Sequence, residues 1–251
     1  MFQNDYRREM DGLRPSPAAV ERLNRLLEEN LVEYHFQPIV DLREGEVMAY
    51  EALMRSKLDT IPTPDQVLAL ARSQSKLYRV EHLTFFGALE AFSRYPEAHG
   101  ATLFVNSIAT QRLSADDELV LSERYPSLLK HLVIEITESD YSREMALYKE
   151  ALARRFGGRL AIDDFGSGYS SLGTLQNLPI DVLKLDRSFL MSSESGERCK
   201  AILDGVVSIA DRLDVDVVVE GVETRDQASM LVRMDNRIIA QGFLYSRPVP
   251  R

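Results

Sequence analysis

The sequence contains a single cysteine, Cys199, and only four histidines, which are scattered along the chain. One cysteine cannot form an intrachain disulfide, and it cannot build a cysteine cluster around a metal ion. The histidines lack the close spacing that places two of them on one face of a helix around a metal. Disulfide-stabilised scaffolds and metal centres built from cysteine or histidine are therefore disfavoured.

Two further absences concern membranes and nucleic acids. No apolar run approaches the roughly 18 residues that a membrane-spanning helix needs, and the polar N-terminus, MFQNDYRREMDGLRPSP, does not resemble a signal peptide. We therefore expect a soluble, cytoplasmic protein without a membrane span. The net charge of −9 disfavours binding to DNA or RNA, which requires clustered lysine and arginine. An acidic site can still hold a small anionic ligand when divalent cations lie between them.

The chain has 251 residues, of which 45% are hydrophobic, enough for a substantial core. Its length suits one large domain or two small ones, but we find no internal repeat, low-complexity segment or linker between domains. We expect residues 1–18 to form an N-terminal arm and residues 19–251 to form the folded domain.

Eight short segments rich in Val, Ile, Leu or Phe are typical of buried strands. Between most of them lie longer segments in which apolar residues recur at helical spacing, such as LYRVEHLTFFGALEAFSRY. The TPDQ segment at 63–66 and Thr224 mark the starts of two of these helices. The expected strands are residues 34–42, 46–53, 101–107, 131–137, 159–165, 181–186, 216–222 and 237–243.

The alternation of strands and helices predicts parallel strands joined by right-handed crossovers. Eight such units favour an α/β fold with a closed, TIM-like (β/α)8 barrel. One connection differs, because only Arg43, Glu44 and Gly45 separate the first two strands, which is too short for a parallel crossover. We therefore expect the first strand to be antiparallel in an otherwise parallel barrel. An open, doubly wound sheet is the alternative that the pattern leaves open.

Polar residues collect at the expected carboxyl ends of the strands, where a β/α barrel carries its chemistry. Any one of them alone is typical of a solvated rim residue or a salt-bridge partner, but together they should converge on one mouth. Asp163 and Asp164 are adjacent carboxylates, which repel each other and are costly to desolvate. Carboxylate and amide oxygens suit Mg²⁺ or Mn²⁺, and two ions bridged by one carboxylate would compensate for this repulsion. The converging residues are Glu51, Asn106, Glu135, Asp163, Asp164, Lys184, Glu220 and Gln241.

Motifs in order along the chain resemble those of the EAL-domain family, bacterial phosphodiesterases that hydrolyse cyclic di-GMP. The family name appears literally as Glu51-Ala52-Leu53, and the resemblance covers about residues 20–250. Two segments depart from the family pattern. VNSIATQRL keeps Asn106 but changes the residues after it, and MDNRIIAQGF is one residue longer than usual, which bears on the placement of Gln241. The other matching motifs are FQPIVDL, IEITES, DDFGSGYSSL, LKLDRSFL, VEGVET and QGFLYSRPVP.

The resemblance implies an EAL-type barrel that binds two metal ions, Mg²⁺ or Mn²⁺. The residues taken as catalytic are Lys184, which would hold and polarise the attacking water, together with Asp163 and Glu220. The ions and the lysine would activate water and neutralise charge on the phosphorus oxygens. The implied ligands are Glu51, Asn106, Glu135 and Asp163 for one ion, and Asp163, Asp164 and Glu220 for the other, with Asp163 bridging.

Further residues are implied to bind the substrate or to hold a loop. Gln37, Leu53, Arg55 and Gln241 resemble the family's substrate contacts, and the guanidinium of Arg55 suits a phosphate oxygen. Glu138 resembles the anchor of the loop after the strand at 159–165. In the family this loop is linked to substrate binding and to the contact between two copies of the domain.

The function implied by the resemblance is hydrolysis of cyclic di-GMP to linear pGpG. The expected partners are cyclic di-GMP as substrate, a second copy of the chain in a homodimer, and a separate sensor or regulatory protein. Two alternatives stay open: a cyclic di-GMP receptor without hydrolytic activity, and a regulatory module that binds other proteins. The presence of every implied metal ligand argues against a loss of activity.

Overall fold

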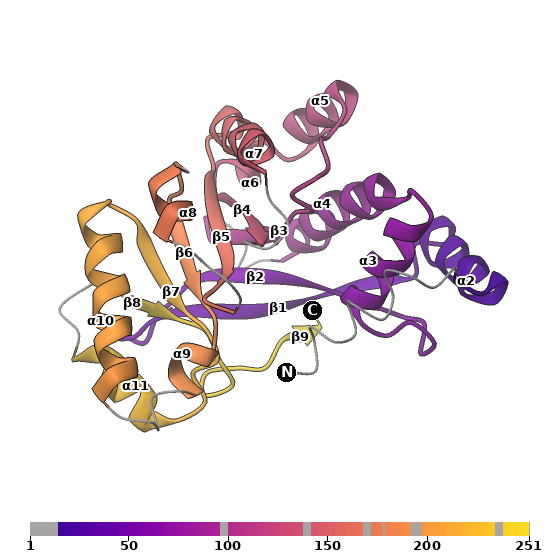
Figure 1. The fold of residues 1–251 in the computed structure, drawn as a ribbon. Coiled ribbons are helices and arrows are strands. Elements are labelled where there is room, and N and C mark those ends of the chain that lie inside the picture. The colour runs from indigo at the N-terminus through magenta and orange to yellow at the C-terminus, as the bar shows by residue number, and fades with distance from the viewer. Residues whose placement is uncertain are drawn as a thin grey trace.

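The computed structural model describes residues 15–95, 100–137, 142–167, 172–177, 179–191, 197–233 and 238–250. A closed barrel of strands lies at its centre, with helices outside it (Figure 1). The predicted (β/α)8 barrel is confirmed, and the alternative of an open sheet is wrong. Helix α2 (Pro17–Glu28) begins after Ser16, whose side chain caps it. No helix in the described part of the chain is long and apolar enough to cross a membrane.

Eight strands close the barrel, and each overlaps one of the predicted segments. A short additional strand, β9 (Val249–Pro250), was not predicted and pairs with β1 near its start. The barrel strands are β1 (Val32–Asp41), β2 (Val47–Ser56), β3 (Thr102–Asn106), β4 (Leu132–Thr137), β5 (Arg159–Phe165), β6 (Val182–Leu185), β7 (Asp216–Val219) and β8 (Ile238–Ala240).

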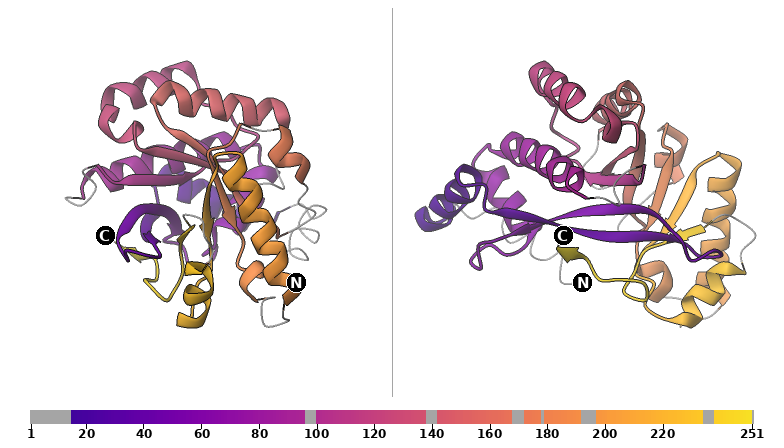
Figure 2. Two further views of the ribbon diagram at one scale, coloured as in Figure 1. Left: turned by 90° about the vertical axis from the view of Figure 1, so that its left-hand side faces the viewer. Right: turned by 180° about the vertical axis from the view of Figure 1, so that it is seen from behind.

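The order of strands around the barrel follows the chain from β2 to β8, and β1 closes the ring between β8 and β2. Neighbours from β2 to β8 are parallel, whereas β1 is antiparallel to both of its neighbours, as predicted. The carboxylate of Asp41 turns the hairpin by accepting hydrogen bonds from the N–H groups of Arg43 (2.7 Å) and Glu44 (3.0 Å). Figures 1 and 2 show β1 and β2 running on as a long two-stranded ribbon toward α2.

The helices predicted from apolar periodicity are all present. Thr63 and Thr224 each form a capping box with the glutamine three residues later, which satisfies backbone N–H groups at the helix start. Helices α5, α6, α8 and α9 were not predicted. The helices after α2 are α3 (Pro64–Ser73), α4 (Leu77–Ser93), α5 (Ala115–Arg124), α6 (Pro126–Leu129), α7 (Arg143–Phe156), α8 (Leu172–Asn177), α9 (Ser188–Met191), α10 (Glu197–Arg212) and α11 (Arg225–Val232).

The inside of the barrel is filled by one apolar layer of side chains, contributed by successive strands. Side chains that alternate with this layer, such as Ile134 and Ile136 on β4, point outward and pack in the larger core between strands and helices. The barrel is therefore a solid platform rather than an open channel. The inner layer consists of Ile39, Ala49, Phe104, Val133, Ala161, Val182 and Val218, with Ile239 partly buried against them.

Gly158→Ala should destabilise the fold, because a Cβ at this position would clash with the backbone carbonyl oxygen of Leu132. The N–H of Gly158 also donates to the carbonyl of Ala153 at 2.8 Å, so the backbone cannot move away without disturbing the end of α7. We expect the free energy of unfolding to fall by about 1–3 kcal/mol, as in other overpacked positions. Urea denaturation followed by circular dichroism measures this change.

Gly205→Ala in α10 is the matched control. A Cβ there meets nothing within 4 Å, and alanine should stabilise a helix interior by roughly 0.5–1 kcal/mol relative to glycine. Equal unfolding free energies for the two variants would contradict the packing argument.

Candidate active site

Seven of the polar residues predicted from the strand ends lie in one layer inside the barrel, together with Gln37, which the resemblance implied as a substrate contact. Each comes two residues after a member of the apolar layer, except that in antiparallel β1 Gln37 comes two residues before Ile39. Residues two apart on a strand share a face, so the apolar layer directs all of these side chains toward one mouth. They are Gln37, Glu51, Asn106, Glu135, Asp163, Lys184, Glu220 and Gln241.

Lys184 on β6 lies at the centre of this polar layer and is fully buried. Four carboxylate oxygens surround its Nζ, none of them in hydrogen-bond geometry, so the contacts are between charges. Lys184 is therefore a buried salt-bridge partner, the alternative that the pattern offered for a lysine at a strand end, and not a solvated rim residue. The oxygens are Glu135 Oε1 at 2.6 Å, Glu220 Oε1 at 2.8 Å, Asp163 Oδ1 at 2.9 Å and Glu51 Oε2 at 3.4 Å.

Opposing effects set the ionisation of this cluster. Burial alone would lower the pKa of Lys184, but the surrounding carboxylates outweigh burial and raise the pKa well above its usual value. Burial likewise raises the pKa of Glu135 well above its usual value, although Lys184 acts against it. The lysine therefore stays charged, whereas full ionisation of all the carboxylates needs further positive charge.

Amide side chains hold the carboxylates in place. The Nδ2 of Asn106 donates to Glu51 Oε1 at 3.1 Å and to Glu135 Oε2 at 3.2 Å. The Nε2 of Gln241 donates to Glu51 Oε2 at 2.6 Å and to Gln37 Oε1 at 3.1 Å. Gln241 therefore belongs to the site, and the longer segment before it does not remove it from the mouth of the barrel.

A β-bulge in β5 explains how two adjacent aspartates serve one site. Neighbouring residues of a regular strand point to opposite faces. Between Ile162 and Phe165, β5 advances three residues while β6 advances two, so β5 contains one inserted residue. Asp164 has a φ of 57°, in the left-handed region that residues other than glycine rarely adopt. This local strain brings Asp164 to the same side as Asp163, which is typical of functional positions.

Besides Glu135, two further carboxyl groups of the site have raised pKa values. Burial, reinforced by the charge of Asp163, raises the pKa of Asp164 to about 6. Burial raises the pKa of Glu220 to about 8 against the opposing charge of Lys184, although 21% of the Glu220 side chain is exposed. Cations bound among these groups would favour their ionised forms and lower both pKa values.

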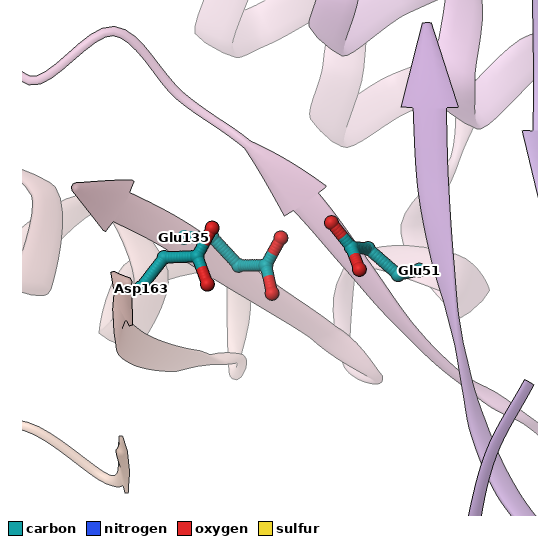
Figure 3. Close-up of side chains that lie close together, drawn as sticks. All are labelled: Glu51, Glu135 and Asp163. Carbon is teal, nitrogen blue, oxygen red and sulfur yellow. The ribbon is translucent and has the colours of Figure 1, made fainter. Parts of the chain in front are cut away.

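The carboxylates form two groups that could each hold a divalent metal ion. Glu51, Glu135 and Asp163 make the first, and Asp163, Asp164 and Glu220 the second; within each group the closest oxygens all lie within 4.8 Å of one another. Figure 3 shows the first group, with the carboxylate of Glu135 between those of Glu51 and Asp163. Asp163 belongs to both groups, as a bridging ligand would.

The donor chemistry also fits a metal. Glu135 Oε1 and Asp163 Oδ1 are buried and have no hydrogen-bond partner among the described residues, apart from their charge contacts with Lys184. A cation would satisfy both oxygens. Carboxylate and amide oxygens are the ligands preferred by hard divalent cations. The site is therefore suited to divalent metal binding.

The site opens into a pocket of about 460 Å³. Glu135 and Lys184 do not line the pocket and are fully buried. Sequence reasoning missed two pocket arginines. Arg187 follows the end of β6, so the strand-end signal could have found it, whereas Arg72 lies on α3, where no such signal applies. Predicted residues that line the pocket are Gln37, Glu51, Leu53, Arg55, Asn106, Asp163, Asp164, Glu220 and Gln241.

One predicted residue, Glu138, lies outside the described residues, as do residues 168–171 of the loop that it would anchor. The start of this loop is described. A Cβ on Gly166, which has a φ of 96°, would clash with the ring of Phe189. The loop start therefore requires glycine, while the anchoring role of Glu138 stays a prediction.

Comparisons with known proteins agree with this geometry. Residues 20–248 match the family model of the EAL domain. The chain is 34% identical over 239 residues to the cyclic di-GMP phosphodiesterase NbdA of Pseudomonas aeruginosa, a match that covers 92% of this chain and 30% of that protein. The chain thus spans about a third of the length of the curated relatives that it matches.

Two solved structures resemble the fold closely. One is described as the PaMucR phosphodiesterase in complex with c-di-GMP, with a TM-score of 0.79 and 30% identity, covering 93% of this chain and 98% of that one. The other is a manganese and c-di-GMP complex of Klebsiella pneumoniae BlrP1 at pH 9.0, with a TM-score of 0.75 and 28% identity, covering 87% and 56%. With the family model matching most of its length and the strand-end residues converging in one site, the chain belongs to the EAL domain family.

Proposed function

We propose that the chain hydrolyses cyclic di-GMP to linear pGpG with two divalent metal ions, Mg²⁺ or Mn²⁺. The observation that carries this proposal is the pair of carboxylate groups that share Asp163 at the base of the pocket. Family membership and the activity named for NbdA support it. Activity, substrate and partners of the whole protein are part of the proposal, since the match covers only 30% of that relative.

The predicted ligand sets account for the acidic layer. Asn106 is the predicted fourth ligand beside Glu51, Glu135 and Asp163; it would turn its amide oxygen to the ion, whereas its Nδ2 faces Glu51 and Glu135 in the structure. Asp163 would connect this group to Asp164 and Glu220. When bound, such ions would neutralise the phosphate oxygens and lower the pKa of the attacking water.

Lys184 supplies the remaining positive charge. Its ammonium group lies beside Asp163 and Glu220, the two other residues that we assign to the reaction. The ammonium does not line the pocket, so it would hold the attacking water through the water oxygen only where that water penetrates to the polar layer. From beneath the pocket its charge would stabilise negative charge on the phosphate in the transition state. The water gives up a proton as its oxygen forms a bond to phosphorus, one phosphodiester P–O bond breaks, and the released ribose oxygen takes up a proton, so that the protons balance.

The pocket wall provides the contacts for the rest of the dinucleotide. Arg55 and Leu53 lie on β2 beyond Glu51, and their side chains line the pocket with Gln37 and Gln241. A guanidinium can pair with a phosphate oxygen in fork geometry, and Leu53 offers an apolar surface to a base. Homodimer formation, a separate sensory partner and a cytoplasmic location stay predictions of this proposal.

The first prediction tests the proposal against the alternatives of a receptor and a protein-binding module. The purified chain should convert cyclic di-GMP to pGpG in Mn²⁺ or Mg²⁺, measured by chromatography of the products, and excess EDTA should abolish turnover because the carboxylates then lack their cations. Binding of cyclic di-GMP with no product in either metal would support a receptor. Neither binding nor turnover would leave only the protein-binding module.

Asp163→Asn should lower kcat by more than about 10²-fold, because changing groups that merely orient metal ligands already costs about 10–100-fold. The substitution keeps the shape of the side chain but removes the charge shared by both groups of carboxylates. Asn106→Ala is the comparison, since Asn106 belongs to only one predicted ligand set and should cause a smaller loss. A kcat for Asp163→Asn within a few-fold of the wild-type value, with an unchanged circular dichroism spectrum, would contradict the two-metal proposal.

Lys184→Met should lower kcat by about 10²–10³-fold, the typical effect of losing an electrostatic stabiliser of the transition state, with a smaller effect on substrate binding. In EDTA the variant should also be about 3–5 kcal/mol less stable, because four buried or partly buried carboxylates lose their common cation. Added Mn²⁺ should recover part of this stability. A lower melting temperature with normal kcat would assign Lys184 a structural role only.

A further inference from the structure

A second buried ion pair lies outside the polar layer, in the shell of helices. Glu81 on α4 and Lys149 on α7 are both completely buried, and Lys149 Nζ donates to Glu81 Oε1 at 2.7 Å. Neither residue lines the pocket or belongs to the carboxylate groups suited to metal binding. The pair is therefore absent from the mechanism described above.

Glu81 also holds the chain that follows β3. Its Oε1 accepts a hydrogen bond from Ser107 Oγ and its Oε2 accepts one from the N–H of Ile108, both at 2.7 Å. These two residues come directly after Asn106, the last residue of β3. The carboxylate thus fixes two consecutive residues, one through its side chain and the other through its backbone.

Stability alone does not explain such a pair. Burying two charges is costly, and replacing a buried ion pair by apolar side chains of similar size is often neutral or stabilising. A carboxylate, however, offers two oxygens that can accept from a hydroxyl and a backbone N–H at once, and Lys149 neutralises the charge that this requires. The arrangement gives direction and rigidity to the segment it binds.

That segment connects directly to the site. The N–H of Ser107 donates to the backbone carbonyl of Glu135 at 2.8 Å, and residues 107–109 form part of the pocket wall. The preceding side chain, Asn106, contacts both Glu51 and Glu135. A shift of the segment would therefore move the Asn106 amide relative to two carboxylates of the first group.

We propose that Glu81, neutralised by Lys149, is a positioning residue that fixes the segment after β3 and thereby sets the Asn106 amide for metal binding. The inference rests on the proposed function only in taking Asn106 as a metal ligand. It assigns a role in the site to two residues of the outer helices that do not themselves line the pocket.

The test compares the double variant Glu81→Gln/Lys149→Met with wild type. The double change removes both buried charges together, so no unpaired charge is left, while glutamine can offer only one accepting oxygen. Glu90→Gln is the matched control. Glu90 lies on the same helix but binds Arg94 and Tyr125, away from the segment after β3. The readouts are the Mn²⁺ dissociation constant by calorimetry without substrate, the melting temperature in EDTA, and kcat.

The double variant should bind Mn²⁺ about tenfold more weakly, the lower end of the effect of losing groups that orient metal ligands, and its kcat should fall. Glu90→Gln should leave the Mn²⁺ affinity unchanged. In an Asn106→Ala background the double change should weaken Mn²⁺ binding little further, because both act on one ligand. Unchanged Mn²⁺ affinity and kcat with a lower melting temperature would overturn the inference.

Ser107→Ala is a milder variant that leaves the ion pair intact and removes one of the two hydrogen bonds. It should weaken Mn²⁺ binding a few-fold, and normal affinity in this variant would count against the inference if the double variant does not fold. Calorimetry needs no turnover, so weaker Mn²⁺ binding supports the inference even if wild type fails to hydrolyse cyclic di-GMP. That failure would refute the proposed function alone.

Discussion

The carboxylates at the mouth of the barrel depend on the ammonium group of Lys184 for charge compensation. Four carboxylates with side-chain exposures of 0–21% lie within 3.4 Å of it, and desolvating each charge without compensation would cost several kcal/mol. One positive charge cannot balance four negative ones. Burial raises the pKa values of Glu135 and Glu220, and the neighbouring carboxylates add to this effect while Lys184 opposes it. The layer is therefore stable enough to fold around Lys184, yet retains an excess of acid that divalent cations can neutralise.

Barrel geometry turns this requirement into a fixed arrangement. The apolar layer fills the interior, and a step of two residues along each strand leads from it to the polar layer. Because the apolar layer is close-packed, the polar side chains above it cannot sink or rotate away without opening a cavity. Strand β5 adds to the regular step, since the inserted residue and the left-handed conformation of Asp164 supply a second carboxylate from one strand.

The regular part of this design could be predicted from sequence, and the irregular part could not. The strand-end positions of Glu51, Glu135 and Lys184 follow from short apolar segments in a parallel barrel. The hairpin at Arg43–Gly45 follows from the shortness of the loop alone. Helix α5 escaped prediction because it buries a single residue, Leu121, and so lacks an apolar stripe. The bulge at Asp164 could not be predicted, because it is defined by the register between β5 and β6. The periodicity of a single strand carries no information about that register.

Contacts between residues far apart in the sequence could not be predicted either. The segments after β5 and β3, which lie next to the carboxylate groups, are held in place in different ways. After β5, backbone conformation does the positioning, through the positive φ of Asp164 and a glycine that fits against Phe189. After β3, the segment is held by the side chain of Glu81, which lies 26 residues before Ser107 in the sequence. Lys149, which lies 42 residues after Ser107, supplies the compensating charge. A lone glutamate such as Glu81 within an apolar helix face predicts no role by itself. Its role follows from the hydrogen-bond donors that the fold places beside it. Strands can supply ligands in register, but the segment after β3 is held by acceptors from a surrounding helix, and this buried carboxylate has a cation of its own in Lys149.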